Sequence, residues 1–400
     1  DLKQIQISSA IDLFSKGEVN QALDAVQDLL KDYPNEPVLF NIKGACYADL
    51  GQLDVAVTNY KEAITIKPDY AKAHFNLAGS LHDLGQLETA VKSYQKAIEI
   101  DASYAEAYNN LGNVFQELKQ VDSAVKSYKM ALEIKPDYVA AQYSLGNTFM
   151  ELGQLEEAVK SYKAALKLKP SFAGAYNKLG SALLELDQLD ESVRSYEAAL
   201  KHKPDYVEAI NNLGIAFYKL QQIDDAMKYY KRALALDPDF ADAHNNIGIV
   251  YLDLGQLDEA AQSYKAALKL KPEFVEAHYN LGVVLQDLGL IEDATESYKN
   301  VIAIDKGFFK AHNNLGVALL DLDQFDEAVK SYKTALELKP DYVEAINNLG
   351  IAFFKLHQLD DAVKCYERAL VLDPVSADAH NNIGAVHLER GQLDEAVNSY

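Results

Sequence analysis

The sequence predicts an all-α protein built from stacked helical hairpins, and three observations lead to this prediction. The chain matches itself at every shift of 34 residues, so its core can grow along one axis. Proline stands near the end of almost every repeat, where it stops a helix. Glycine and alanine recur at fixed places inside the repeat, where two helices can approach closely. With 49% apolar residues, the 400-residue chain has enough hydrophobic material to fold.

Counted from Lys3, the repeats give eleven complete units from 3 to 376 and a partial twelfth at 377–400. A residue's place within its 34-residue unit is called its position. We expect residues 1–400 to form a single solenoid in which each unit contacts mainly its neighbours. Because the chain begins with Asp1 and the twelfth unit stops part-way, we also expect a fragment of a longer protein.

Each unit contains two predicted helices. The first covers about positions 1–14 and the second about 18–31, with a short polar turn between them that is often Gly-Gln. Position 8 is mostly Gly and position 20 almost always Ala, which suits a close helix crossing, and the tyrosine at position 24, from Tyr60 to Tyr400, is expected to fill the wider gap between hairpins. The second helix is expected to stop before position 32, which is proline in most units: Pro34, Pro68, Pro136, Pro170, Pro204, Pro238, Pro272, Pro340 and Pro374.

The segment 105–138 shows the pattern most completely, with Tyr108, Leu111, Gly112, Phe115, Ala124, Tyr128, Ala131 and Pro136. This pattern resembles the tetratricopeptide repeat, and the likeness covers nearly the whole chain. The resemblance implies a right-handed superhelical solenoid of helix-turn-helix repeats. It also implies that the first helices line the concave side and the second helices the convex side.

One stripe of the first helix is predicted to face outward. At about 100° per residue, positions 4, 7, 8, 11 and 14 fall on one side and should pack, whereas positions 2, 5, 6, 9, 12 and 13 fall on the opposite side. Position 6 of that second stripe is asparagine in eight units, although asparagine is a poor helix former. These residues form the predicted ladder: Asn76, Asn110, Asn212, Asn246, Asn280, Asn314, Asn348 and Asn382.

Two interpretations of the ladder remain open. A carboxamide offers a donor and an acceptor together, so the row could grip the backbone of an extended peptide. Alternatively, the same carboxamides could tie adjacent helices to each other. A similar asparagine row lies in the repeat arm of the protein O-linked N-acetylglucosamine transferases, which these repeats resemble.

Apolar residues flank the ladder in the C-terminal half, and exposed apolar stripes commonly mark a partner. They complete the predicted peptide-binding set: Ile215, Tyr218, Ile249, Leu252, Val283, Val317, Leu320, Ile351 and Phe354. The N-terminal half is more polar at these positions, for example at Asn113 and Gln116. Position 13 is mostly acidic, so we expect a neutral or basic partner rather than an acidic one.

Several functions are disfavoured. The net charge of −22 argues against nucleic acid and against an anionic membrane. Five of the nine histidines stand at position 4 and are expected to pack, the sequence has no metal-binding or nucleophile motif, and we expect no cofactor, no metal and no catalytic residue. Cys46 and Cys365 are not assumed to pair and suit the cytoplasm. The clamp that some family members use for a chaperone's C-terminal carboxylate needs Lys at position 5, where no repeat has it.

The sequence therefore predicts a non-enzymatic scaffold for protein–protein interaction that binds extended polypeptide along its concave groove. The alternative is the substrate-recognition arm of a larger transferase whose catalytic domain is absent here. End-to-end self-association is a further expectation, since the partial twelfth hairpin leaves a packing face uncovered.

Overall fold

Residues 2–399, which the computed structural model describes, fold into 24 α-helices in two compact units, Asp1–Tyr206 and Val207–Tyr400. The N-terminal unit contains α1 (Leu2–Ser15), α2 (Val19–Asp32), α3 (Pro37–Asp49), α4 (Leu53–Ile66), α5 (Ala71–Asp83), α6 (Leu87–Ile100), α7 (Ala105–Glu117), α8 (Val121–Ile134), α9 (Val139–Glu151), α10 (Leu155–Leu168), α11 (Ala173–Glu185) and α12 (Leu189–His202). The C-terminal unit contains α13 (Val207–Lys219), α14 (Ile223–Leu236), α15 (Ala241–Asp253), α16 (Leu257–Leu270), α17 (Val275–Asp287), α18 (Ile291–Ile304), α19 (Phe309–Asp321), α20 (Phe325–Leu338), α21 (Val343–Lys355), α22 (Leu359–Leu372), α23 (Ala377–Glu389) and α24 (Leu393–Ser399).

Helices pair as the repeat predicts, with shifts of one residue at their ends. In complete hairpins after the first, the odd-numbered helix covers positions 1–13 and the even-numbered helix covers positions 17–30. No helix among residues 2–399 is both long enough and apolar enough to cross a bilayer. That the two units together form one continuous solenoid stays a prediction.

The turn inside each hairpin is a left-handed helix cap at position 15. In the second hairpin the N–H of Gly51 donates to the carbonyl of Ala48, and the N–H of Gln52 donates to the carbonyl of Tyr47, which is the Schellman pattern. Gly51 has φ +74°, a value that glycine adopts without strain. The same position keeps positive φ where glycine is missing: Lys119, Asp187, Gln221, Asp323 and His357.

Close packing inside the hairpin explains the small residues. Ala226, at position 20, is fully buried. A Cβ added at Gly112 would lie 2.6 Å from Cε1 of Tyr128, so the tyrosine ring rests directly on the glycine backbone of its own hairpin. The same ring also belongs to a buried cluster with the next hairpin, as Tyr230 does with Ile247 and Val250, so the expected packing between hairpins is found together with this contact inside the hairpin. The ring lies on a position-8 glycine in the hairpins from Tyr60 to Tyr366 except that of Tyr94, where position 8 is Ala78, and Tyr400 lies outside the described residues.

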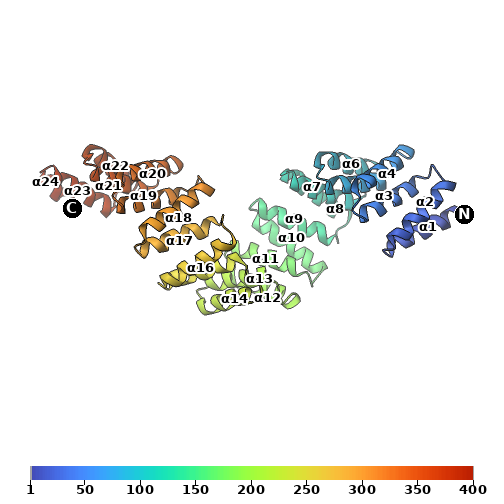
Figure 1. The fold of residues 1–400 in the computed structure, drawn as a ribbon, viewed down its shortest axis with the longest axis horizontal. Helices are drawn as coiled ribbons and strands as arrows, with labels where there is room; N and C mark the ends of the chain where they lie inside the picture. The colour runs from blue at the N-terminus through green and yellow to red at the C-terminus, as the bar shows by residue number, and fades with distance from the viewer. Residues whose placement is uncertain (1, 400) are drawn as a thin grey trace. The chain divides into compact units, whose positions relative to one another are not determined.

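Within each unit, consecutive hairpins stack side by side (Figure 1). The first helices of successive hairpins touch one another, as α3 touches α5 and α15 touches α17. Among the described residues, the second helices of successive hairpins do not touch. The first helices therefore lie on the inner side of each stack, as the resemblance implied. Their outward stripe is called the open face.

Candidate peptide-binding surface

The predicted binding residues all lie on first helices and are half-buried, so each is anchored in the stack and still reaches solvent. Two belong to the N-terminal unit, Asn76 on α5 and Asn110 on α7. The C-terminal unit carries the remainder: Asn212, Ile215 and Tyr218 on α13, Asn246, Ile249 and Leu252 on α15, Asn280 and Val283 on α17, Asn314, Val317 and Leu320 on α19, Asn348, Ile351 and Phe354 on α21, and Asn382 on α23.

Hydrogen bonds tie most ladder residues to the preceding hairpin. Asn246 donates from Nδ2 to Oδ1 of Asn211, at position 5 of the hairpin before, over 3.0 Å. The ties of this kind are Asn76 to Asn41, Asn348 to Asn313, Asn382 to Asn347 and, with a tyrosine hydroxyl as acceptor, Asn314 to Tyr279. The interpretation of the ladder as a link between helices therefore holds at these positions. A carboxamide has two N–H groups and an acceptor oxygen, so after one such hydrogen bond it still has a donor and an acceptor for a ligand.

The prediction that position 5 faces outward is wrong, because its asparagines are mostly buried. Exposure runs from 0% at Asn313 to 5% at Asn109 and Asn245. The first helix packs against its own second helix and against both neighbouring hairpins, so its buried arc is wider than one stripe. The buried set is Asn41, Asn109, Asn177, Asn211, Asn245 and Asn313.

Two position-5 asparagines show what happens without a tie. Oδ1 of Asn109 is buried and has no hydrogen-bond partner, and the residue 35 places later is Ser144 instead of asparagine. Oδ1 of Asn245 is likewise buried without a partner, although Asn280 stands 35 places later. Asn280 is therefore a ladder residue that does not support the position-5 amide before it.

The side chain at position 9 lies next to the hydroxyl group of the position-24 tyrosine in the same hairpin. In the N-terminal unit, the Tyr128 hydroxyl donates to Oδ1 of Asn113 over 2.8 Å. Tyr162 makes the same bond to Asn147, also over 2.8 Å. The polar residues at position 9 in this unit therefore complete the hydrogen bonding of the core.

In two hairpins of the C-terminal unit, an aliphatic residue at position 9 leaves this hydroxyl without a partner, whereas the Tyr298 hydroxyl, in the hairpin of Val283, donates to Oε1 of Gln286. Tyr264 lies in the hairpin of Ile249 and Tyr332 in the hairpin of Val317, and both hydroxyl groups are buried without a hydrogen bond. A buried polar group left unpaired costs about 1–3 kcal/mol. In these two hairpins the apolar residue on the open face therefore costs stability.

Some acids at position 13 contact a polar side chain at position 12 of the preceding hairpin. His82 Nε2 lies 2.7 Å from Oε1 of Glu117, and the Tyr218 hydroxyl donates to Asp253. Asp253 and Glu117 are exposed, so they still present negative charge to solvent.

The position-4 histidines connect their helix to the turn before it. His244 Nε2 lies 3.1 Å from the carbonyl oxygen of Pro238, six residues earlier. The same contact occurs at His74, His278, His312 and His380. These histidines therefore have a structural partner, consistent with the packing role predicted for them.

Neither cysteine is placed for nucleophilic chemistry. Both are free, and burial raises the pKa of the Cys46 thiol and of the Cys365 thiol to about 11. A thiol with a raised pKa carries little thiolate at neutral pH. In the part of the chain that the structure describes, no group of three His, Cys, Asp or Glu side chains could hold a metal ion.

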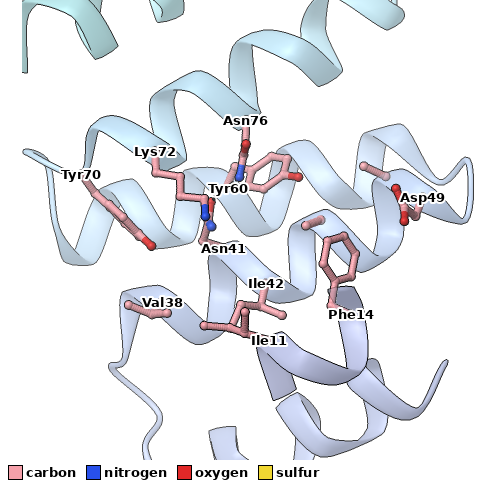
Figure 2. Close-up of a pocket in the computed structure, with 12 residues that line it drawn as sticks. Ile11, Phe14, Val38, Asn41, Ile42, Asp49, Tyr60, Tyr70, Lys72 and Asn76 are labelled. Carbon is pink, nitrogen blue, oxygen red and sulfur yellow. Dashed lines mark hydrogen bonds between the residues drawn. The ribbon is translucent and has the colours of Figure 1, made fainter. Parts of the chain in front are cut away.

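The N-terminal unit contains an apolar pocket of about 320 Å³ that was not predicted from the sequence. Figure 2 shows it between α1, α3 and α5, with Ile11 and Phe14 of α1 near Ile42 of α3. The signal that could have found it is Ala45 with Ala48, because positions 9 and 12 are both small in this repeat alone among the complete repeats after the first.

Family models decide the classification. A model described as "TPR repeat" matches residues 44–84, 78–119, 146–187, 180–221, 216–255, 248–289, 318–357 and 352–389, and models described as "Tetratricopeptide repeat" match 105–138 and 275–308. The chain belongs to the tetratricopeptide repeat family. The all-α fold predicted from the 34-residue period is thereby confirmed.

Two curated relatives carry the name peroxisomal targeting signal receptor. The protein from Candida glabrata is 30% identical over 76 residues, and that from Saccharomyces cerevisiae is 27% identical over 77 residues. Each match covers 19% of this chain and 13% of the receptor. The chain thus spans about an eighth of the length of these relatives.

Solved structures with similar repeats include MamA, at 31% identity and a TM-score of 0.37, covering 38% of this chain and 90% of that one. YrrB, described as a TPR protein with an unusual peptide-binding site, has 26% identity and a TM-score of 0.42, covering 46% and 95%. The hetero-tetramer Cut9–Hcn1 has 16% identity and a TM-score of 0.48, covering 100% and 92%.

Proposed function

We propose that the chain is a protein-interaction scaffold whose open face binds extended polypeptide, with the longest site in the C-terminal unit. Membership in the tetratricopeptide repeat family supports an interaction role. The observation that carries the proposal is the aliphatic row at position 9, which includes Ile249 and Val317. These residues leave a buried tyrosine hydroxyl unpaired behind them, so an apolar open face is kept where a polar one would be more stable.

The ladder and the apolar row have complementary roles in this proposal. Apolar side chains of the bound segment pack on positions 9 and 12, and the carboxamides of position 6 hydrogen-bond to its backbone. The tie from Asn246 to Asn211 fixes the orientation of the carboxamide before a ligand arrives. A pre-oriented side chain loses less entropy on binding.

Charge supports a neutral or basic segment. The chain carries 60 acidic and 38 basic residues, and position 13 places acids such as Asp253 along the rim of the open face. Opposite charge speeds encounter and disfavours partners of the same sign. The names of two relatives, which describe receptors for a targeting signal, support a recognition role for these repeats.

Several finer expectations stay predictions. They are the absence of catalysis, the cytoplasmic location, end-to-end self-association and the alternative role as the recognition arm of a larger transferase. Each is compatible with the same open face.

Asn280 gives the decisive test, because its tie is missing. Asn280→Ala removes a carboxamide that supports no buried partner, so thermal stability should stay unchanged while binding of an extended neutral or basic peptide weakens by about 0.5–1.5 kcal/mol. Asn246→Ala is the matched control, because it also strips the buried Oδ1 of Asn211 of its partner and should lower the melting temperature.

Fluorescence anisotropy with unstructured peptides that differ in charge measures the binding, and circular dichroism measures the melting. If Asn280→Ala leaves peptide affinity unchanged, the ladder does not bind the peptide. If no peptide of any charge binds the wild-type chain, the proposed function fails.

A further inference from the structure

The apolar pocket of the N-terminal unit has an opposite charge at each end. Lys72 stands at the second residue of α5, and Asp49 is the last residue of α3. Both side chains line the pocket and are exposed. Between them the walls are mainly apolar, from Ile11, Phe14 and Ile42. Figure 2 shows Lys72 and Asp49 on opposite sides of this apolar floor.

Helix direction strengthens this polarity. α1, α3 and α5 are first helices separated by antiparallel second helices, so they run parallel. Their amino ends, which carry partial positive charge, lie at the Lys72 end of the pocket, and their carboxyl ends lie at the Asp49 end. The two formal charges and the helix dipoles therefore have the same sense along the pocket.

The dimensions suit a short extended segment. From Val38 to Asp49 the pocket follows eleven residue steps of α3, which is roughly 16 Å at 1.5 Å per residue. An extended chain advances about 3.1–3.4 Å per residue, so roughly five residues span this length. The apolar middle has room for one large side chain.

We propose that this pocket binds an extended peptide segment with one bulky apolar side chain between an acidic and a basic residue about five residues apart, and that Lys72 and Asp49 fix its direction. The inference rests on the proposed binding of polypeptide and adds the chemistry of one anchor site. The acidic residue faces Lys72, the basic residue faces Asp49, and the apolar side chain fills the space left by Ala45 and Ala48. The tie from Asn76 to Asn41 spans α3 and α5 beside this site.

The test uses two capped, proline-rich peptides of identical composition, each with a single Phe. One carries Glu before and Lys after the Phe, and the other reverses the order. The full chain should prefer one order roughly three- to ten-fold, since each exposed pair contributes a small energy. The charge-swapped variant Lys72→Glu with Asp49→Lys should reverse the preferred order.

A matched control lies in the C-terminal unit. Asp287 and Lys310 occupy the same positions of successive hairpins and are exposed, but Val283 and Gln286 stand where the pocket has its alanines. Asp287→Lys with Lys310→Glu should therefore keep the wild-type order of preference.

A second variant fills the pocket. Ala45→Ile with Ala48→Tyr installs the residues found at Ile215 and Tyr218, which the same helix positions accommodate elsewhere, so the hairpin should fold. Affinity for the preferred peptide should fall roughly ten-fold or more, because one large apolar side chain loses its burial.

The outcomes separate this inference from the proposed function. Equal binding of the two peptide orders, or equal binding to the filled variant, overturns the pocket proposal. If neither peptide binds while other neutral or basic peptides do, the pocket proposal fails and the proposed function stands. If no peptide binds at all, both fail.

Discussion

The two units differ in how position 9 of the open face treats the buried tyrosine hydroxyl behind it: some residues accept its hydrogen bond and others do not. In the N-terminal unit, Asn113 and Asn147 at position 9 accept hydrogen bonds from the buried tyrosines behind them. In the C-terminal unit, Ile249 and Val317 do not, and the hydroxyl groups of Tyr264 and Tyr332 stay unpaired. The difference teaches that a tetratricopeptide hairpin folds with either choice. The residue at position 9 can therefore be set by what the open face contacts.

High pH should expose the buried tyrosines of both units, and this is the largest effect we expect. Burial raises the pKa of Tyr94 and of Tyr128 to about 12, and it raises the pKa of Tyr264 and of Tyr332 further. A tyrosine whose pKa is higher in the folded chain stabilises the fold fully below about pH 10, and this contribution disappears as pH rises through the folded pKa.

Each buried tyrosine should thus remove about 1.4 kcal/mol per pH unit above pH 10. Circular dichroism and tyrosinate absorbance should report cooperative alkaline unfolding. Two transitions, with the C-terminal unit losing more stability in total, would sharpen the comparison. Gradual ionisation of tyrosines without loss of helix would contradict it.

Swapping the small residue at position 8 should give the next largest effect. A Cβ at Gly248 would lie 2.6 Å from Cε1 of Tyr264, so Gly248→Ala should destabilise the C-terminal unit by about 1–3 kcal/mol through overpacking. The N-terminal unit supplies the reciprocal variant, because Ala78 stands opposite Tyr94 with both side chains buried. Ala78→Gly should also destabilise, through lost packing and helix propensity. Urea denaturation checks both, and a stabilised Gly248→Ala would show that the ring shifts freely.

These packing rules could be predicted from the sequence to different extents. The period, the hairpins and the small residues at positions 8 and 20 can be predicted because nearly every 34-residue repeat shows the same pattern. The burial of Asn313 could not be predicted, because a helical wheel treats one helix alone and the burial arises from neighbouring hairpins. The pocket at Ala45 could not be predicted from the consensus either, since it depends on one repeat departing from it.

Exchanging the residues at position 9 between the two units should change the free energy of unfolding by about 1 kcal/mol, with a gain in the C-terminal unit and a loss in the N-terminal unit. Ile249→Asn should give Tyr264 the partner that Asn113 gives Tyr128, and so stabilise the C-terminal unit. Asn113→Ile should remove the acceptor of the Tyr128 hydroxyl and destabilise the N-terminal unit. If the open face binds peptide, Ile249→Asn should gain stability and lose affinity together, a combination that a purely structural role would not produce.

Tyrosine-to-phenylalanine variants provide the control for that exchange. Tyr264→Phe removes a hydroxyl that has no partner and should be neutral or stabilising, whereas Tyr128→Phe removes a 2.8 Å hydrogen bond and should cost about 0.5–1.5 kcal/mol. Equal effects of the two variants on the denaturation midpoint would mean that the units do not differ in this respect.

The smallest expected effect concerns the turn at position 15, which should not distinguish the units. Gln221 holds φ +60° and Lys119 holds φ +59°, a left-handed conformation that costs a side-chain-bearing residue about 1–2 kcal/mol. Gln221→Gly and Lys119→Gly should relieve this strain, but glycine loses more entropy on folding, so the net gain should stay below about 1 kcal/mol.

Gly255→Gln is the reverse control, because a Cβ there would touch nothing within 4 Å and the change acts through the backbone alone. Equal gains at Gln221 and Lys119 would place the difference between the units at position 9 and not in the hairpin itself. A loss of stability in either glycine variant would mean that chain entropy outweighs the strain.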